Sequence, residues 1–376
     1  MSRATCRIRR KLARTTRFVA LLSATAMIAA CTAPPRKPAR SAGQVRAEVL
    51  HLLPAQAHAR EAWADAVTDA FFALDIEPST AHLCAALAVA EQESNFVADP
   101  EVPGLGRIAR EEIARRAQAH HVPQLVLDAA LAIHSSNGRS YADRIAAART
   151  ERELSLVYED LIDRVPLGQR LFADANPVKT AGPMQVSVTF AEQFARTHRY
   201  PYARVQDEPL RHEVFTLRGG VYFGIAHLLG HPVSYDRMLY RFADYNAGFY
   251  ASRNAAFQNA VSVASGKRLT LDGDLIDYDG GTGQTELALQ TLAGALDLSP
   301  AQIHRALERG ESPDLETTDV YARLYALADK RASAPLPRAM LPQIDLSSPK
   351  ITRKLTTQWF AERVQQRYRA CLARAE

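Results

Sequence analysis

Apolar side chains recur every three or four residues along most of this chain, which is the period of an amphipathic α-helix. Three stripes are clearest, and they comprise Leu83, Ala86, Leu87 and Ala90; Leu289, Leu292, Ala293 and Leu296; and Leu355, Trp359, Phe360, Val364 and Cys371. Ser79 or Thr80 can cap the helix of the first stripe. From about Val45 onward, the pattern therefore predicts a mainly α protein.

Turn-forming residues and shorter apolar runs predict further elements. Pro300 directly after Ser299 is typical of the first turn of a helix. We expect two more helices over residues 124–133 and 141–163. The dipeptide Asp272-Gly273 favours a tight turn, so one small hairpin is predicted over residues 269–276.

The composition is that of a globular protein. The chain has 376 residues, of which 47% are hydrophobic and 23% charged, which excludes a disordered or fibrous protein. Its net charge of +5 arises from the first 30 residues, which carry seven basic and no acidic side chains. Without them, 39 basic residues face 41 acidic ones, a net charge of −2. We therefore expect no nucleic-acid partner.

The N-terminus has the order of an export signal. The apolar run over residues 18–30 would rise only about 20 Å as a helix, whereas a bilayer core is roughly 30 Å thick. The run ends in IAAC at residues 28–31, which resembles the lipobox of bacterial lipoproteins. The resemblance implies a signal peptide over residues 1–30 and acylation of Cys31. Because Thr32 rather than Asp follows, it also implies an outer-membrane lipid anchor on the periplasmic face; an ordinary signal peptide is the alternative.

Two cysteines remain in the mature chain, Cys84 and Cys371. An exported protein meets an oxidising compartment. A disulfide that clamps the last helix onto the core is therefore one interpretation, and two buried free thiols are the other. The cysteines and histidines have no zinc-binding spacing, and we expect no metal and no cofactor.

Glu93 is the first candidate for chemistry. It lies three residues after Ala90, at the edge of the apolar stripe. A partly desolvated carboxyl group favours its neutral form and becomes a better acid near neutral pH. A Glu on the flank of an amphipathic helix is more often a solvated boundary residue, so this position alone is a weak signal.

Two later sequence blocks carry polar groups that suit sugars. In AGPMQV at residues 181–186, a tight glycine turn leads to a buried Met beside a Gln; in DYNAG at 244–248, a glycine is placed to end a helix. Amides and a tyrosine hydroxyl supply the paired donors and acceptors that sugar hydroxyl and acetamido groups need. Taken singly, such blocks are more often a turn, a core Met and a helix cap than a sugar-binding site.

In this order, the blocks resemble the three motifs of the family that includes goose-type lysozymes and lytic transglycosylases, glycoside hydrolase family 23. ESNF at residues 93–96 resembles its catalytic Glu, followed by Ser and an aromatic residue. GPMQ at 182–185 is similar to Gly-Leu-Met-Gln, and DYNAG is similar to Ala-Tyr-Asn-Ala-Gly. The resemblance covers roughly residues 78–261. The whole chain is also similar to an uncharacterised proteobacterial lipoprotein family, domain of unknown function 1615.

The resemblance implies a lysozyme-like helical domain that cuts peptidoglycan glycan strands. Glu93 would act as the single acid and base of a lytic transglycosylase, leaving 1,6-anhydro ends. The implied sugar-binding and supporting residues are Ser94, Met184, Gln185, Tyr245 and Asn246. A hydrolase would need a second carboxylate to hold a water molecule, for which Asp244 is the candidate.

Several departures from the family pattern define the expected domains. Gly182 follows Glu93 by 89 residues, far more than in the family, which implies a helical insertion at about 99–176. We expect a lipidated tether at 31–44, the lysozyme-like domain at 45–261 and a helical extension at 262–376. Pro183 and Asp244 replace the usual Leu and Ala. These changes favour the alternative, a catalytically weak or inactive scaffold that binds glycan and unknown envelope proteins.

Three weaker signals have ordinary explanations. His227 and His231 lie four residues apart and could share a metal, but a packed helix accounts for them. The acidic loop at 272–279 fits no register of a calcium-binding EF-hand. The basic residues of the last helix are those of a solvated face near a helix C-terminus, and they are Arg363, Arg367, Arg369 and Arg374.

Overall fold

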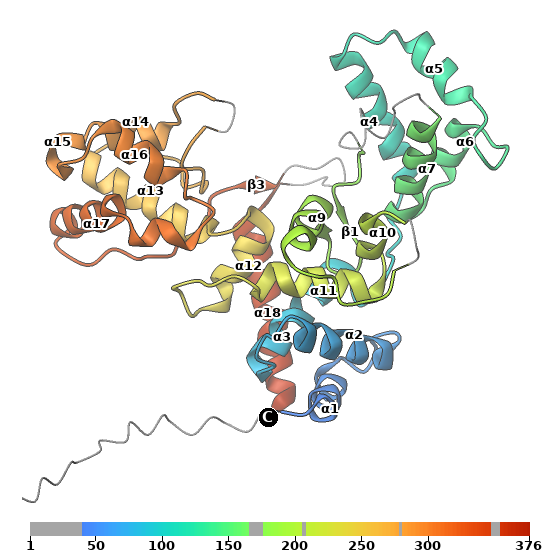
Figure 1. Cartoon of the computed structure of the whole chain (residues 1–376), viewed down its shortest axis with the longest axis horizontal. Coiled ribbons are helices and arrows are strands. Elements are labelled where there is room, and N and C mark those ends of the chain that lie inside the picture. The colour runs from blue at the N-terminus through green and yellow to red at the C-terminus, as the bar shows by residue number, and fades with distance from the viewer. Residues whose placement is uncertain (1–39, 165–175, 205–207, 278–279, 347–353) are drawn as a thin grey trace, which may run out of the picture. The chain divides into compact units, whose positions relative to one another are not determined.

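The computed structural model describes residues 40–164, 176–204, 208–277, 280–346 and 354–376 (Figure 1). The expected signal peptide, Cys31 and most of the expected tether lie outside the described residues. The described chain is mainly helical, with two small antiparallel strand pairs, which confirms the predicted class.

The helices before the predicted second motif are α1 (Ala42–Leu52), α2 (Arg60–Ala73), α3 (Thr80–Ser94), α4 (Leu105–Ala119), α5 (Gln124–Ala132), α6 (Tyr141–Ala147) and α7 (Glu151–Asp163). The following elements are β1 (Thr180–Ala181), β2 (Val186–Ser187), α9 (Val188–Thr197), α10 (Leu210–Val214), α11 (Leu217–Leu229), α12 (Met238–Ala247) and α13 (Ala251–Ser265). The last are α14 (Gln284–Gln290), α15 (Ala293–Leu296), α16 (Pro300–Leu307), the 3₁₀ helix η2 (Pro313–Thr317), α17 (Asp319–Ala332), β3 (Asp345–Leu346), β4 (Leu355–Thr356) and α18 (Thr357–Ala375).

The helix boundaries follow local capping chemistry. Ser79 accepts a hydrogen bond from the third residue of α3, and Ser299 forms a capping box with Gln302 at the start of α16. The helix expected over 141–163 is broken into α6 and α7, because Thr150 caps α7 in a box with Glu153. The stripe expected at 289–296 is likewise divided between α14 and α15.

The predicted hairpin at residues 269–276 is wrong. No strand forms there; instead, the Gln258 side chain accepts from the Gly273 backbone N–H at 2.8 Å and donates to the Asp274 carbonyl oxygen at 2.9 Å. A helix side chain thus satisfies the backbone groups that a partner strand would otherwise bind. The two strand pairs lie elsewhere, β1 with β2 and β3 with β4.

Among the described residues, buried apolar side chains form two clusters. The larger one draws on helices α1 to α12, and it also includes Phe360, Val364 and Cys371 of α18. The smaller one lies among α13 to α17 and includes Phe257 and Leu324. The last helix therefore packs with the first part of the chain, beside α3 and α12 (Figure 1).

A disulfide joins Cys84 of α3 to Cys371 of α18, 287 residues apart in sequence. Both cysteines are fully buried in the larger cluster. Because α3 carries Glu93 in its last turn, this bond fixes the C-terminal helix against the helix of the first motif.

Candidate functional site

The first motif lies at the C-terminal end of α3. Glu93 is partly buried one residue before the helix ends, and the next residues, Asn95 and Phe96, both have left-handed backbone conformations. The Trp63 indole holds this sharp exit, since it donates to the Phe96 carbonyl oxygen at 2.9 Å and packs edge-on against the Phe96 ring. These contacts fix the path of the backbone just after Glu93.

The second motif forms the turn between β1 and β2. Gly182 has a φ of +73°, which favours glycine, and a Cβ added there would lie 2.0 Å from the Val214 carbonyl oxygen. Met184 is buried against Gly224 of α11, where an added Cβ would lie 2.5 Å from the methionine sulfur. The hairpin therefore needs glycines in two different elements.

Tyr245 links the third motif to the second. Its hydroxyl donates to the Met184 carbonyl oxygen at 2.6 Å. Desolvation raises the Tyr245 pKa well above its usual value, and the nearby negative charge of Glu93 raises it further. The structure thus joins the second and third blocks by a hydrogen bond and places Tyr245 within electrostatic range of Glu93 in the first. We call Glu93, Met184, Gln185 and Tyr245 the motif junction.

Ser94 and Asn246 have other contacts. The Ser94 hydroxyl is buried and donates to the Ala90 carbonyl oxygen within α3, at 3.0 Å. The exposed Asn246 accepts from the Thr357 hydroxyl at the start of α18, also at 3.0 Å. The proposed roles of both residues in sugar binding stay predictions.

Asp244 is a capping residue in this fold. Its carboxylate accepts from the Ser252 backbone N–H in the first turn of α13 at 2.6 Å, and from the Tyr235 hydroxyl. Burial raises the pKa of Asp244 to about 7, while the Ser252 bonds and the charge of Arg253 oppose that rise. A carboxylate engaged in this way is poorly placed to hold a hydrolytic water at the motif junction.

Sequence reasoning missed Glu151, the first residue of α7. This residue is only 7% exposed, and its carboxylate accepts from the Gln185 side-chain amide at 2.8 Å. The one available signal was the capping box of α7, which marks the helix start but not its neighbours.

Sequence reasoning also missed the surroundings of Arg367, which was expected on a solvated face. Its side chain is partly buried, 3.8 Å from the Glu91 carboxylate. Desolvation lowers the Arg367 pKa, and the charges of Glu91 and Glu93 oppose that shift. The last helix therefore brings a cation to the end of α3.

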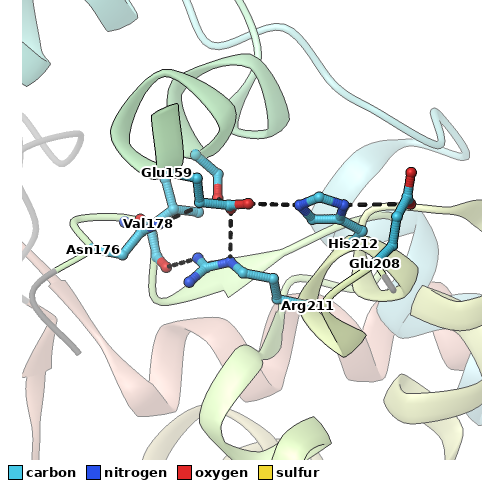
Figure 2. A network of polar contacts seen from close by, with 7 residues as sticks. Glu159, Asn176, Val178, Glu208, Arg211 and His212 are labelled. Atoms are coloured by element: carbon cyan, nitrogen blue, oxygen red, sulfur yellow. Dashed lines mark hydrogen bonds and ion pairs between the residues drawn. The ribbon is translucent and has the colours of Figure 1, made fainter. Parts of the chain in front are cut away.

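A second polar network ties α7 to α10, as Figure 2 shows. Glu159 of α7 lies 3.1 Å from the Arg211 guanidinium and 2.6 Å from the His212 imidazole. Arg211 also donates to the Val178 carbonyl oxygen, next to β1. The network borders a small polar pocket lined in part by Asn176, Lys179 and Glu192. Because Glu159 pairs with Arg211 and His212, the network braces α7 against α10 and the segment before β1.

His227 and His231 pack against aromatic side chains of the third motif region, Tyr245 and Phe249. The His227 ring is 4.9 Å from the Tyr245 ring, and the His231 ring packs on Phe249 at 4.6 Å. Burial lowers the pKa of His227 to about 4 and that of His231 to about 3, the latter helped by Arg241. Within the described ranges, no group of three or more His, Cys, Asp or Glu side chains is arranged to hold a metal ion. No helix of that same part of the chain is long and apolar enough to cross a membrane.

Residues 56–374 match the family described as "Protein of unknown function (DUF1615)". The chain belongs to this family. It is 50% identical over 355 residues to the uncharacterized protein YaiW of Escherichia coli (strain K12), a match that covers 93% of this chain and 96% of that protein. No solved structure matches the chain. Membership in the family brings no known activity, so function must be argued from the site.

Proposed function

We propose that the protein is a lytic transglycosylase-like lipoprotein that cuts peptidoglycan glycan strands. The observation that carries the proposal is the motif junction: Tyr245 binds the Met184 carbonyl oxygen at 2.6 Å and feels the charge of Glu93. The three blocks, whose first residues lie 89 and 62 residues apart, also follow one another in the order of the lytic transglycosylase motifs. If the three blocks were unrelated turns and helix caps, there would be no reason for Tyr245 to bond to Met184 within range of the Glu93 charge.

In the proposed reaction, Glu93 acts first as an acid. It donates its proton to the glycosidic oxygen between N-acetylmuramic acid and N-acetylglucosamine as the bond from C1 to that oxygen breaks. The carboxylate then takes the proton of the muramic C6 hydroxyl while O6 bonds to C1, which leaves a 1,6-anhydro end without water. Such acid–base assistance contributes about 10²–10⁴ to a rate.

The remaining site residues bind and orient the strand in this proposal. Gln185 and Asn246 offer amide groups, and Tyr245 fixes the carbonyl oxygen beside Gln185. The Asp244 carboxylate is engaged at α13, which favours the lytic outcome over hydrolysis. Lipidation of Cys31 would hold the domain at the outer membrane, within reach of the glycan.

A specific observation supports a second candidate, a glycan-binding scaffold without turnover. The Gln185 amide and the Asn246 side chain already have internal hydrogen bonds, so fewer of their groups are open to a substrate. The insertion would then offer surfaces for envelope proteins.

The test is a digest of purified sacculi with the full chain in mild detergent, beside Glu93→Gln and Glu91→Gln. Glu91 is the matched control, because it lies on the same helix and also interacts with Arg367. Anhydro-muropeptides from the wild type and Glu91→Gln, but not from Glu93→Gln, are expected by mass spectrometry. Reducing ends would make the protein a hydrolase. Sacculus binding without any product would leave the scaffold, and neither binding nor product would refute both.

A further inference from the structure

The inserted helices reach the motif junction through Glu151. The preceding residue, Thr150, forms a bridge with Glu101, and the Val102 backbone N–H donates to the Arg149 carbonyl oxygen at 2.9 Å. These contacts pair the segment that follows α3 with the residues at the start of α7. The long segment between the first two motifs therefore contributes one side chain, Glu151, to the motif junction.

Glu151 is held as a buried acceptor. A carboxylate on a residue that is only 7% exposed is costly unless its charge is stabilised. The positive end of the α7 dipole does this at the first helical position, and the Gln185 amide adds a hydrogen bond to Oε2. An ionised carboxylate can accept hydrogen bonds but cannot donate them.

Two acceptors, the Glu151 carboxylate and the Gly182 carbonyl oxygen, set the orientation of the Gln185 amide. Its Nε2 group faces Glu151 and also donates to the Gly182 carbonyl oxygen at 3.3 Å. The amide oxygen Oε1 consequently faces the other way, where it accepts from the exposed Thr180 hydroxyl at 3.2 Å. A carbonyl oxygen has two lone pairs, so Oε1 retains the capacity to accept one more hydrogen bond.

We propose that Glu151 is a positioning residue that makes Gln185 present an acceptor to the glycan, so that the site selects a hydrogen-bond donor of the sugar, a hydroxyl or an acetamido N–H. The inference rests on the proposed glycan-binding function and applies to an enzyme and to a scaffold alike. It gives the insertion a role in recognition, because α7 belongs to the inserted segment.

The test measures binding of peptide-free glycan strands of alternating N-acetylglucosamine and N-acetylmuramic acid, with Glu93→Gln as the background to prevent turnover. Glu151→Leu removes the acceptor, and the dissociation constant is expected to rise about tenfold, the effect of one hydrogen bond of ordinary strength. Glu151→Gln keeps the shape and one acceptor but lets the Gln185 amide reverse, and an increase of about threefold is expected. If the protein with Glu93 intact cleaves glycan, the Glu151 variants should raise its KM and leave kcat constant.

Glu153→Gln is the matched control. It makes the same charge change two residues along the exposed face of α7, and glutamine preserves the capping box with Thr150. Unchanged binding by both Glu151 variants, or equal losses in Glu151→Gln and Glu153→Gln, would overturn the inference. If Glu151→Leu does not fold, Glu151→Gln decides alone. Absence of glycan binding by the parent would instead refute the proposed function, and this inference with it.

Discussion

The Tyr245 hydroxyl donates to the Met184 carbonyl oxygen at 2.6 Å, across 61 residues of sequence. This bond joins the last turn of α12 to the hairpin turn between β1 and β2. The negative charge of Glu93 also raises the pKa of Tyr245. The hydrogen bond therefore links the position of the hairpin to the end of α3.

Tyr245→Phe should separate a local stability effect from an effect on the site. Loss of the hydroxyl leaves the Met184 carbonyl oxygen without this donor, which costs about 1–3 kcal/mol. Glycan cleavage or binding should fall further than this stability loss explains. Tyr250→Phe is the control, because Tyr250 makes a similar bond of 2.9 Å to the Pro232 carbonyl oxygen. Equal functional losses in the two variants, with urea unfolding as the stability measure, would count against the motif junction.

Removal of the disulfide should destabilise the larger cluster. The bond between Cys84 and Cys371 closes a loop of 287 residues, and loss of a native disulfide typically costs about 2–5 kcal/mol. We expect the Cys84→Ala, Cys371→Ala double variant to unfold at lower urea than the wild type, and reduction of the wild type to reproduce the shift. Identical midpoints for oxidised and reduced protein would contradict the prediction.

Asp244 should make the protein less stable as the pH rises. Its pKa is raised from 3.8 to about 7 in the folded chain, so the folded state binds a proton more tightly than the unfolded state. Stability is therefore greatest below about pH 4 for this group and is lost between about pH 4 and 7, by an amount on the order of a few kcal/mol. Asp244→Asn keeps an acceptor for Ser252, and its stability should be flatter over this window. A slope unchanged from wild type would refute the assignment.

The buried histidines should make the protein less stable as the pH falls, opposite to the effect of Asp244. Because the pKa values of His227 and His231 are lowered to about 4 and about 3, the unfolded chain binds protons that the folded chain excludes. Their contribution to stability is present above about pH 6.5 and is lost as the pH falls toward 4. The His227→Phe, His231→Phe double variant should lose less stability on acidification, as followed by urea unfolding at several pH values. A steeper loss in the variant would show that other groups dominate.

The sequence predicted those parts of the fold that depend on local chemistry. Three predicted helix ends are confirmed, at Ser79, Ser299 and Gly248, because a cap needs only neighbouring residues. The hairpin at Asp272-Gly273 failed for a non-local reason. The Gln258 side chain, far from the turn in sequence, satisfies its backbone and replaces a partner strand.

The candidate site shows the same division. Glu93, Met184 and Tyr245 were identifiable from three short blocks, and their meeting follows from the fold. Glu151 and Arg367 were not identifiable, because a carboxylate at a helix start and an arginine on a basic helix are ordinary on their own. Only long-range packing gives them neighbours at the site.

Gly182→Ala should disrupt the second motif through two separable effects. The left-handed backbone at Gly182 disfavours any side chain, and a Cβ there would lie 2.0 Å from the Val214 carbonyl oxygen. Gly138 also has a positive φ, of +81°, but an added Cβ would meet nothing within 4 Å. Gly138→Ala therefore reports the backbone strain alone, expected at about 1 kcal/mol. Gly182→Ala should cost more, because the turn must move away from α10 and shift the carbonyl oxygen that Tyr245 binds. Urea unfolding measures both losses, and equal values would mean that the hairpin tolerates the movement and that its close contact with Val214 is not required.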